Sequence, residues 1–275
     1  GGAAVREELN EGDSSMFILR RIEHLNDIPI LIIAALIFGA VGVIIGLISR
    51  RFVFPGQKRE EGEEKLADTV HTSILGFSGF ILALALTSAF ANLSKVEESI
   101  MQEALDISRL ARELGALGAP ADAAQTALKN YTRRVADVEW KTLGESPPSL
   151  SPEAAKDLDT LWREIRGLQA NASLVPDHVR GPLNTYLERI ESTRRSRLAF
   201  ATYSLPEIFW TLIILFFIAA AIMDARHPHK KFGALMIASH MAVIGVVIAL
   251  VMIVDNPFSG QASIDSEIIR SALNR

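Results

Sequence analysis

The chain has 275 residues and a formal net charge of −4, so it lacks the excess of basic residues that would indicate nucleic-acid binding. It contains no cysteine, which excludes disulfides, thiolate metal ligands and cysteine catalysis. Hydrophobic residues make up 49% of the chain and gather in four blocks separated by charged segments, which indicates a membrane protein.

Residues 1–27 are predicted to be a polar N-terminal arm followed by an amphipathic lead-in. The lead-in, 16–27, can place its apolar residues on one face and lie along a membrane surface; the alternative is a solvated linker. No secretory signal peptide is visible, because the first apolar run is followed by Arg50-Arg51 rather than by a small-residue cleavage site. That run is therefore expected to be a retained anchor.

Residues 28–94 are predicted to form the first pair of membrane helices, 28–49 and 69–94, joined by a charged connection. Small residues let helix backbones approach closely in lipid. Five glycines are therefore expected to pack: Gly39, Gly42, Gly46, Gly76 and Gly79. The alternative is that glycine is simply common in membrane helices.

Residues 95–204 are predicted to be a polar helical insertion outside the membrane. Apolar residues recur at helical spacing in four stretches: 96–117, 124–138, 151–168 and 176–190. The first stretch includes Leu105, and Ser151 is expected to cap the third with Pro152 in its first turn. The first and last helices are expected to continue into the adjoining membrane helices, because no turn signal interrupts them.

Residues 205–254 are predicted to form the second pair of membrane helices. Pro206 and Glu207 begin the third membrane helix, where proline is tolerated and a negative charge meets the positive helix end. Ala234, Ala238 and Ala242 recur at four-residue spacing and are expected to form a packing ridge on the fourth helix.

Residues 255–275 are predicted to be an exit motif and a short tail. The exit motif is Asp255-Asn256-Pro257-Phe258-Ser259-Gly260. Asp255 ends the apolar run, Pro257 cannot continue a helix interior, and Gly260 permits a turn. The whole pattern predicts an all-α integral membrane protein, with four transmembrane helices and a helical extramembrane bundle inserted between helices 2 and 3.

Lysine and arginine in the short segments predict an orientation. They are concentrated in the connections 50–68 and 224–231, whereas the arm and the tail carry few. By the positive-inside rule these two connections lie in the cytoplasm, and both termini and the insertion face outward.

Several short motifs keep a particular order and spacing along the chain. They are Glu103-Ala104, Tyr131 followed by Glu139-Trp140, Arg195-Ser196-Arg197-Leu198, Leu205-Pro206 and the exit motif. Each motif is weakly specific alone, but together they resemble the bestrophin-like domain-of-unknown-function family of bacterial membrane proteins, from the second membrane helix onward.

The resemblance implies a pentameric anion channel with an apolar neck lined by the second membrane helix. It also implies a cytoplasmic insertion, which conflicts with the charge count; we give the charge count slightly more weight. In bestrophins a Pro-Phe-Gly segment precedes acidic residues that help to hold calcium. Here Ser259-Gly260-Gln261 follows Pro257-Phe258, and Asp265 and Glu267 are the only acidic residues after it. A calcium site is therefore not favoured.

The second membrane helix carries the candidate pore-lining residues Phe77, Phe80, Thr87, Ser88 and Phe90. Phenyl rings can form a hydrophobic constriction that gates by dewetting. The alternative is that these side chains face lipid or neighbouring helices.

His240 and Glu207 are the polar candidates in the membrane helices. An ionisable residue such as His240 inside a membrane helix is a functional candidate, although a neutral histidine bonded to a neighbouring helix is the plainer explanation. Glu207 can simply balance a helix end. His71, His227 and His229 suggest a metal only weakly, because cysteine and a His-Glu-x-x-His pattern are missing; no metal and no cofactor are predicted.

Arg194, Arg195 and Arg197 are expected to lie close to the membrane. They can pair with lipid phosphates or draw anions toward a pore mouth, and a solvated role is the alternative. Glu139-Trp140 is expected to anchor packing within the insertion.

Two functions remain open from the sequence. The first is a homo-oligomeric ion channel for small anions, pentameric by the resemblance, in a bacterial cytoplasmic membrane. The second is a membrane-anchored sensor or interaction module whose insertion binds a partner without transport. An enzyme has little support, because no nucleophile elbow, phosphate loop or paired carboxylates are visible.

Overall fold

The computed structural model describes residues 28–53, 61–171, 174–226, 230–260 and 263–274. They fall into two compact units. Unit 1 comprises the chain up to Thr87 together with Leu205–Ile253, and unit 2 comprises Ser88–Ser204 together with the chain from Val254 onward. The predicted lead-in at 16–27 lies outside the described residues.

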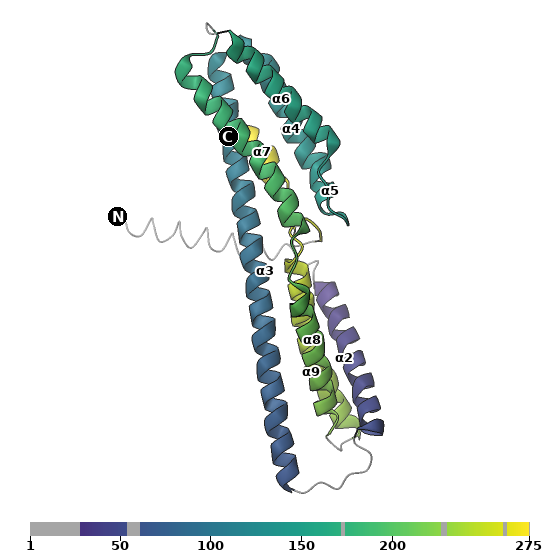
Figure 1. Ribbon diagram of the computed structural model, residues 1–275. Helices are drawn as coiled ribbons and strands as arrows, with labels where there is room; N and C mark the ends of the chain where they lie inside the picture. Colours follow the sequence, from purple (N-terminus) through teal and green to yellow (C-terminus); the bar gives the residue numbers. More distant parts are fainter. Residues whose placement is uncertain (1–27, 54–60, 172–173, 227–229, 261–262, 275) are drawn as a thin grey trace, which may run out of the picture. The chain divides into compact units, whose positions relative to one another are not determined.

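Every regular element within the described ranges is a helix, so the predicted all-α class is confirmed (Figure 1). Unit 1 contains α2 (Ile28–Phe52), the first part of α3 (Glu61–Leu117), α8 (Glu207–Asp224) and α9 (Lys230–Val254). Unit 2 contains the rest of α3, η2 (Ala119–Ala121), α4 (Asp122–Arg134), the π-helical segment η3 (Val135–Glu139), α5 (Trp140–Leu143), α6 (Pro152–Ala170), α7 (Asp177–Thr202), α10 (Glu267–Arg270) and η4 (Ser271–Asn274).

Four stretches among the described residues are long and apolar enough to cross a membrane: Ile28–Phe52, Glu64–Leu117, Asp177–Asp224, whose apolar part is α8, and Gly233–Val254. Their apolar parts are the four blocks that the sequence predicts to cross. The α3 helix begins at Glu61 rather than at the predicted residue 69. It continues without a break into unit 2, as expected, and it ends before Gly118, whose φ of 69° suits glycine.

The last helix of the insertion does not continue into the third membrane helix, and that prediction was wrong. Helix α7 ends at Thr202, the chain is extended at Tyr203, and α8 begins at Glu207. The physical reason is Pro206, which lacks an N–H group and disfavours a helical conformation for Leu205 before it.

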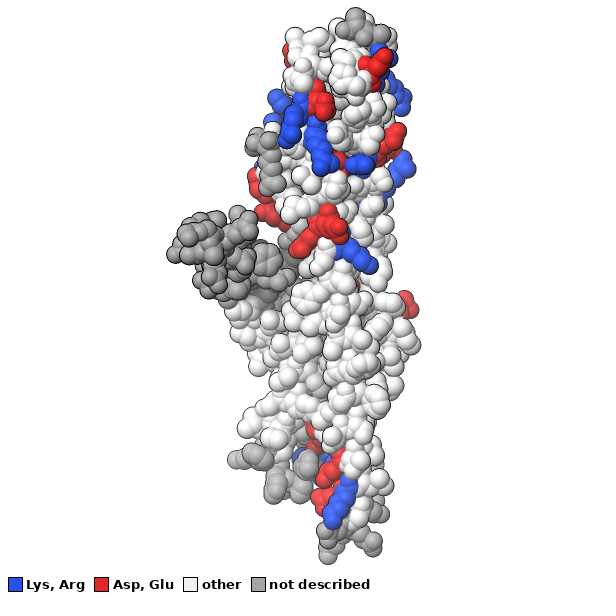
Figure 2. All heavy atoms as spheres, turned by 90° about the vertical axis from the view of Figure 1, so that its left-hand side faces the viewer, with Lys and Arg blue, Asp and Glu red and all other residues white. Residues whose placement is uncertain are grey.

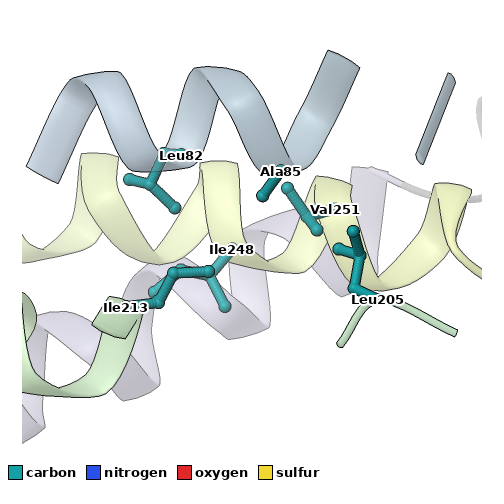
Figure 3. Close-up of a cluster of buried hydrophobic side chains, with 6 residues drawn as sticks. All are labelled: Leu82, Ala85, Leu205, Ile213, Ile248 and Val251. Atoms are coloured by element: carbon teal, nitrogen blue, oxygen red, sulfur yellow. The ribbon is translucent and has the colours of Figure 1, made fainter. Parts of the chain in front are cut away.

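Unit 1 is held together by apolar side chains between its helices. One cluster joins Leu82 and Ala85 of α3 to Ile213 of α8 and Val251 of α9 (Figure 3). A second joins α8 and α9, with Met241 fully buried in it. The cavity lined by α3, α8 and α9 side chains near Ser78 has a volume of about 10 Å³, too small for a hydrated ion.

Unit 2 buries the apolar stripes that the sequence predicts. Its fully buried residues include Ile100 and Leu110 of α3, Leu128 of α4 and Leu161 of α6. Leu105 is an exception, because it is 43% exposed and its neighbour Ala104 takes the buried position. Ser151 caps α6 as predicted, since its hydroxyl accepts a hydrogen bond from the Ala154 N–H.

Candidate functional site

The apolar part of α3 has a packed side and an exposed side. Ser78, Leu82 and Ala85 are buried against the other helices of unit 1. The opposite side mixes hydroxyl, glycine and phenyl groups; its exposed residues include Thr69, Ser73, Gly76, Phe80, Ala83 and Thr87. Figure 2 faces the α3 side of the molecule and shows this stretch without acidic or basic side chains, which appear where α3 begins and on the helices of unit 2.

This exposed side differs from that of α2. The exposed residues of α2 are almost all aliphatic, with Leu36 at 68% and Leu47 at 58% exposure. Such an aliphatic surface is suited to contact with the hydrocarbon chains of lipids. On α3, hydroxyl groups and glycines interrupt the apolar surface, and the Ser73 hydroxyl donates to the carbonyl of Thr69. The α3 side therefore carries groups that a purely lipid-facing surface does not need.

The predicted pore-lining residues are spread over this side rather than aligned in one row. Phe80 and Thr87 are seven residues apart, so they lie within about 20° of each other around the helix. Phe77 and Phe90 lie about 140° apart at 3.6 residues per turn. Phe77 also stacks on Phe216 of α8 at 6.4 Å between ring centroids, and Ser88 is half-buried. Phe80 and Thr87 are thus the central pair of the predicted set.

The glycines of α2 pack against α9. A Cβ atom at Gly39 would lie 3.0 Å from the Ala238 carbonyl oxygen, and one at Gly42 would lie 2.2 Å from Cγ of Met241. Gly46 faces Ile237 in the same way, at 3.1 Å.

Of the three alanines predicted to form a packing ridge on α9, two contact α2 at Gly39. Ala238 and Ala242 both approach Gly39, and Ala234 is half-buried. Gly76 and Gly79 pack against no other described residue of the chain, because a Cβ at either position has nothing within 4 Å, so their expected packing role stays a prediction for contacts between copies. Both glycines lie on the exposed side of α3.

The polar candidates of the membrane helices have different surroundings. His240 Nδ1 lies 2.7 Å from Oδ2 of Asp224, the last residue of α8. His71 lies on the other side of this carboxylate, with Nε2 3.3 Å from Oδ1. Glu207 is exposed in the first turn of α8. His227 and His229 lie outside the described residues.

Unit 2 contains a buried network of ion pairs. The Arg197 guanidinium is fully buried between Glu103 of α3, at 2.9 Å, and Glu139 of η3, at 2.8 Å. The Arg194 guanidinium donates to Glu139 at 2.6 Å and to the carbonyl of Ser151 at 2.9 Å. Two acids and two arginines therefore balance in charge, as buried charges require.

An aromatic pair completes the network. The Tyr131 hydroxyl donates to Glu103 at 3.4 Å, and burial, followed by the Glu103 charge, raises the pKa of this phenol. The Trp140 ring lies 5.8 Å from the Arg197 guanidinium.

The network corrects the interpretation of the arginines. Arg194 and Arg197 are buried and engaged with carboxylates, so they do not pair with lipid phosphates or attract anions. Arg195 is exposed and pairs with Glu191 in the preceding turn of α7. The sequence did not predict these pairs, because Glu103 and Arg197 are 94 residues apart and no local signal joins them.

The exit motif packs inside unit 2. Phe258 contacts Trp140 edge-on at 5.4 Å, and a Cβ on Gly144 would lie 2.6 Å from the Phe258 carbonyl oxygen. The Pro257 carbonyl accepts a hydrogen bond from the Ile264 N–H. Gly260 has a φ of 81°, which fits the predicted turn. Asp255 is buried and Asn256 exposed at the end of α9.

Comparison with known proteins places this architecture in a family. The family model described as Bestrophin-like domain matches residues 34–269. This match covers most of the chain, so the protein belongs to the bestrophin-like family and is a multi-pass membrane protein. No curated protein matches its sequence.

Solved structures of a bacterial bestrophin homologue from Klebsiella pneumoniae have a similar fold. The structure determined by Zn-SAD phasing has a TM-score of 0.62 and 14% sequence identity, over 88% of this chain and 97% of that chain. A single-residue variant of the homologue has a TM-score of 0.63 and 12% identity, over 90% and 95% of the two chains. At such identities the likeness concerns the fold.

Proposed function

We propose that this protein is a homo-oligomeric ion channel for small anions, with the membrane part of α3 lining the path. The exposed side of α3 is the observation that carries this proposal. It combines hydroxyl groups, glycines and phenyl rings, whereas the exposed side of α2 is aliphatic. Family membership supports the channel class.

The path is proposed to form between copies of the chain. One cavity in unit 1 holds about 10 Å³, and among the described residues a Cβ at Gly76 or Gly79 would meet no atom within 4 Å. Gly79 lies about 80–100° from Thr87 and Phe80 around the helix, and glycine lets helix backbones approach closely, so a second copy can pack beside α3 at Gly79 while Gly76, Phe80 and Thr87 face the axis. Phenyl rings that narrow the path would let it gate by dewetting, and hydroxyl groups would donate hydrogen bonds to a passing anion.

The membrane is proposed to be the cytoplasmic membrane of a bacterium, and a pentamer is the assembly suggested by the family resemblance. The boundaries at residues 94–95, between the membrane helices and the insertion, and at 254–255, between the last membrane helix and the exit motif, also remain proposals.

The decisive experiment exploits the absence of cysteine. Phe80→Cys and Thr87→Cys are each reconstituted in liposomes, chloride flux is recorded, and a charged methanethiosulfonate reagent is added. We expect both variants to be modified and their flux to change at least several-fold, because a charge is placed in the path. Leu36→Cys, on the aliphatic side of α2, is the matched control and should not respond.

Flux through the unmodified protein is measured first. Absence of chloride flux at every voltage, pH and calcium concentration tested, from a protein that is folded and oligomeric, would contradict the channel. The same result would favour a membrane-anchored sensor or interaction module. Modification at Leu36→Cys but not at Phe80→Cys would assign the path to a different helix.

A further inference from the structure

We propose that His71, Asp224 and His240 form a binding site for a transition-metal ion of the zinc type in unit 1. This proposal does not depend on ion conduction. The three residues come from α3, the end of α8 and the middle of α9. One ligand atom from each lies within 4.8 Å of the others.

The geometry is close to that of a metal site. Two ligand atoms that each lie about 2.0–2.1 Å from Zn²⁺ at a tetrahedral angle are about 3.4 Å apart. His71 Nε2 and Asp224 Oδ1 are 3.3 Å apart, which is longer than an ordinary N–H···O hydrogen bond and close to the separation of two zinc ligands. His240 Nδ1 lies 2.7 Å from the other carboxylate oxygen, Oδ2, so this pair needs to separate and the carboxylate to turn before a single oxygen of Asp224 can share an ion with both imidazoles.

The donor set selects the class of metal. Two imidazoles and one carboxylate suit zinc and its neighbours, whereas magnesium and calcium prefer oxygen ligands alone. Three protein ligands leave a fourth position for water. The side chains are 15%, 12% and 30% exposed for His71, Asp224 and His240, so the cluster is sheltered but reachable from outside.

The surroundings explain why a cation fits here. A carboxylate among apolar helices needs positive charge or hydrogen-bond donors nearby. Arg226, two residues after Asp224, pairs with Asp68 at 2.6 Å. Among the described contacts of the Asp224 carboxylate are the two imidazole rings, whose centroids are 6.2 Å apart. A bound divalent ion would supply positive charge and join α3, α8 and α9 at one point.

Metal binding can be measured on the full chain in detergent. Chelator-treated protein is titrated with Zn²⁺ by calorimetry, and Co²⁺ is used to record the absorption bands of a tetrahedral site. We expect one tight equivalent per chain and a melting temperature that rises with Zn²⁺ concentration. His71→Gln, Asp224→Asn and His240→Gln should each weaken binding by more than the roughly 10–100-fold that losing an outer partner costs.

Histidines elsewhere in the chain provide the controls. His178→Gln removes an exposed histidine of α7 and should leave binding unchanged. The double variant His227→Gln/His229→Gln should also keep the tight equivalent. If His71→Gln fails to fold, His240→Gln gives the same test at the most exposed position of the cluster.

The proposal is overturned if the unmodified protein binds no Zn²⁺, or if the tight equivalent survives all three substitutions. It is equally overturned if only the His227→Gln/His229→Gln variant loses binding. The three residues would then be a hydrogen-bonded group and nothing more.

Discussion

Arg195 and Arg197 show how two neighbouring arginines of α7 take opposite roles. Arg195 is exposed and pairs with Glu191 one turn away, whereas Arg197 is fully buried between two carboxylates. An exposed pair of this kind contributes little to stability, because water already solvates both charges. A buried carboxylate without its cation is costly, since it must either stay charged in a low-dielectric environment or take up a proton at neutral pH. Replacing arginine is therefore expected to lower the stability of the protein much more at position 197 than at position 195.

Arg197→Met keeps most of the unbranched apolar part of the side chain and removes the guanidinium with its charge. We expect it to destabilise unit 2 by about 3–5 kcal/mol, because Glu103 and Glu139 lose a shared partner. Arg195→Met is the matched control, with an expected change of less than ~1 kcal/mol. Thermal unfolding in detergent, followed by circular dichroism, measures both. Equal losses would show that the buried pairs do not stabilise the unit.

The buried network also explains the motifs that carried the family resemblance. Glu103, Tyr131, Glu139-Trp140 and Arg197 are dispersed along the sequence, and they meet at one place in unit 2. Replacing one of these residues removes an ion pair or hydrogen bond that the remaining buried polar groups need.

At the scale of the helices, close approach of α2 and α9 depends on glycine. The Gly39 backbone faces the Ala238 carbonyl, which belongs to the main chain and cannot rotate away as a side chain can. Gly76 on α3 has open space around its Cβ position. Gly39 and Gly76 both lie in apolar helices, but an added methyl group has space only at Gly76.

Gly39→Ala should therefore lower the stability of unit 1 by about 1–3 kcal/mol, as overpacking does. Gly76→Ala is the control, and in the monomer it should be neutral or stabilising by roughly 0.5–1 kcal/mol, because alanine favours a helix. Melting of the detergent-solubilised protein distinguishes them. A greater loss for Gly76→Ala than for Gly39→Ala would place the main helix contact on α3 instead of α2.

At the scale of the whole molecule, four apolar stretches determine how the chain crosses the membrane. One crossing precedes Phe52 and two precede Thr126, so the two residues should lie on opposite sides. The lysine and arginine count further predicts that Thr126 faces outward, whereas the layout of bestrophins implies the cytoplasm.

Labelling of Phe52→Cys and Thr126→Cys in intact cells tests this prediction, since both residues are exposed and the chain has no other cysteine. We expect an impermeant maleimide to label Thr126→Cys alone. Labelling of Phe52→Cys alone would support the bestrophin orientation. Labelling of both would contradict an odd number of crossings between them.

The sequence alone determined most of the helices, the four crossing stretches and the cap of α6, because these depend on periodicity and on residues close together in the chain. It also supplied the family, through dispersed motifs. The tertiary structure decided which charges are buried and which atoms meet: Arg197 with Glu103, and His71 with Asp224 and His240. The physical reason is that such contacts join residues far apart in sequence, and only the packing of the helices brings them within a few ångströms.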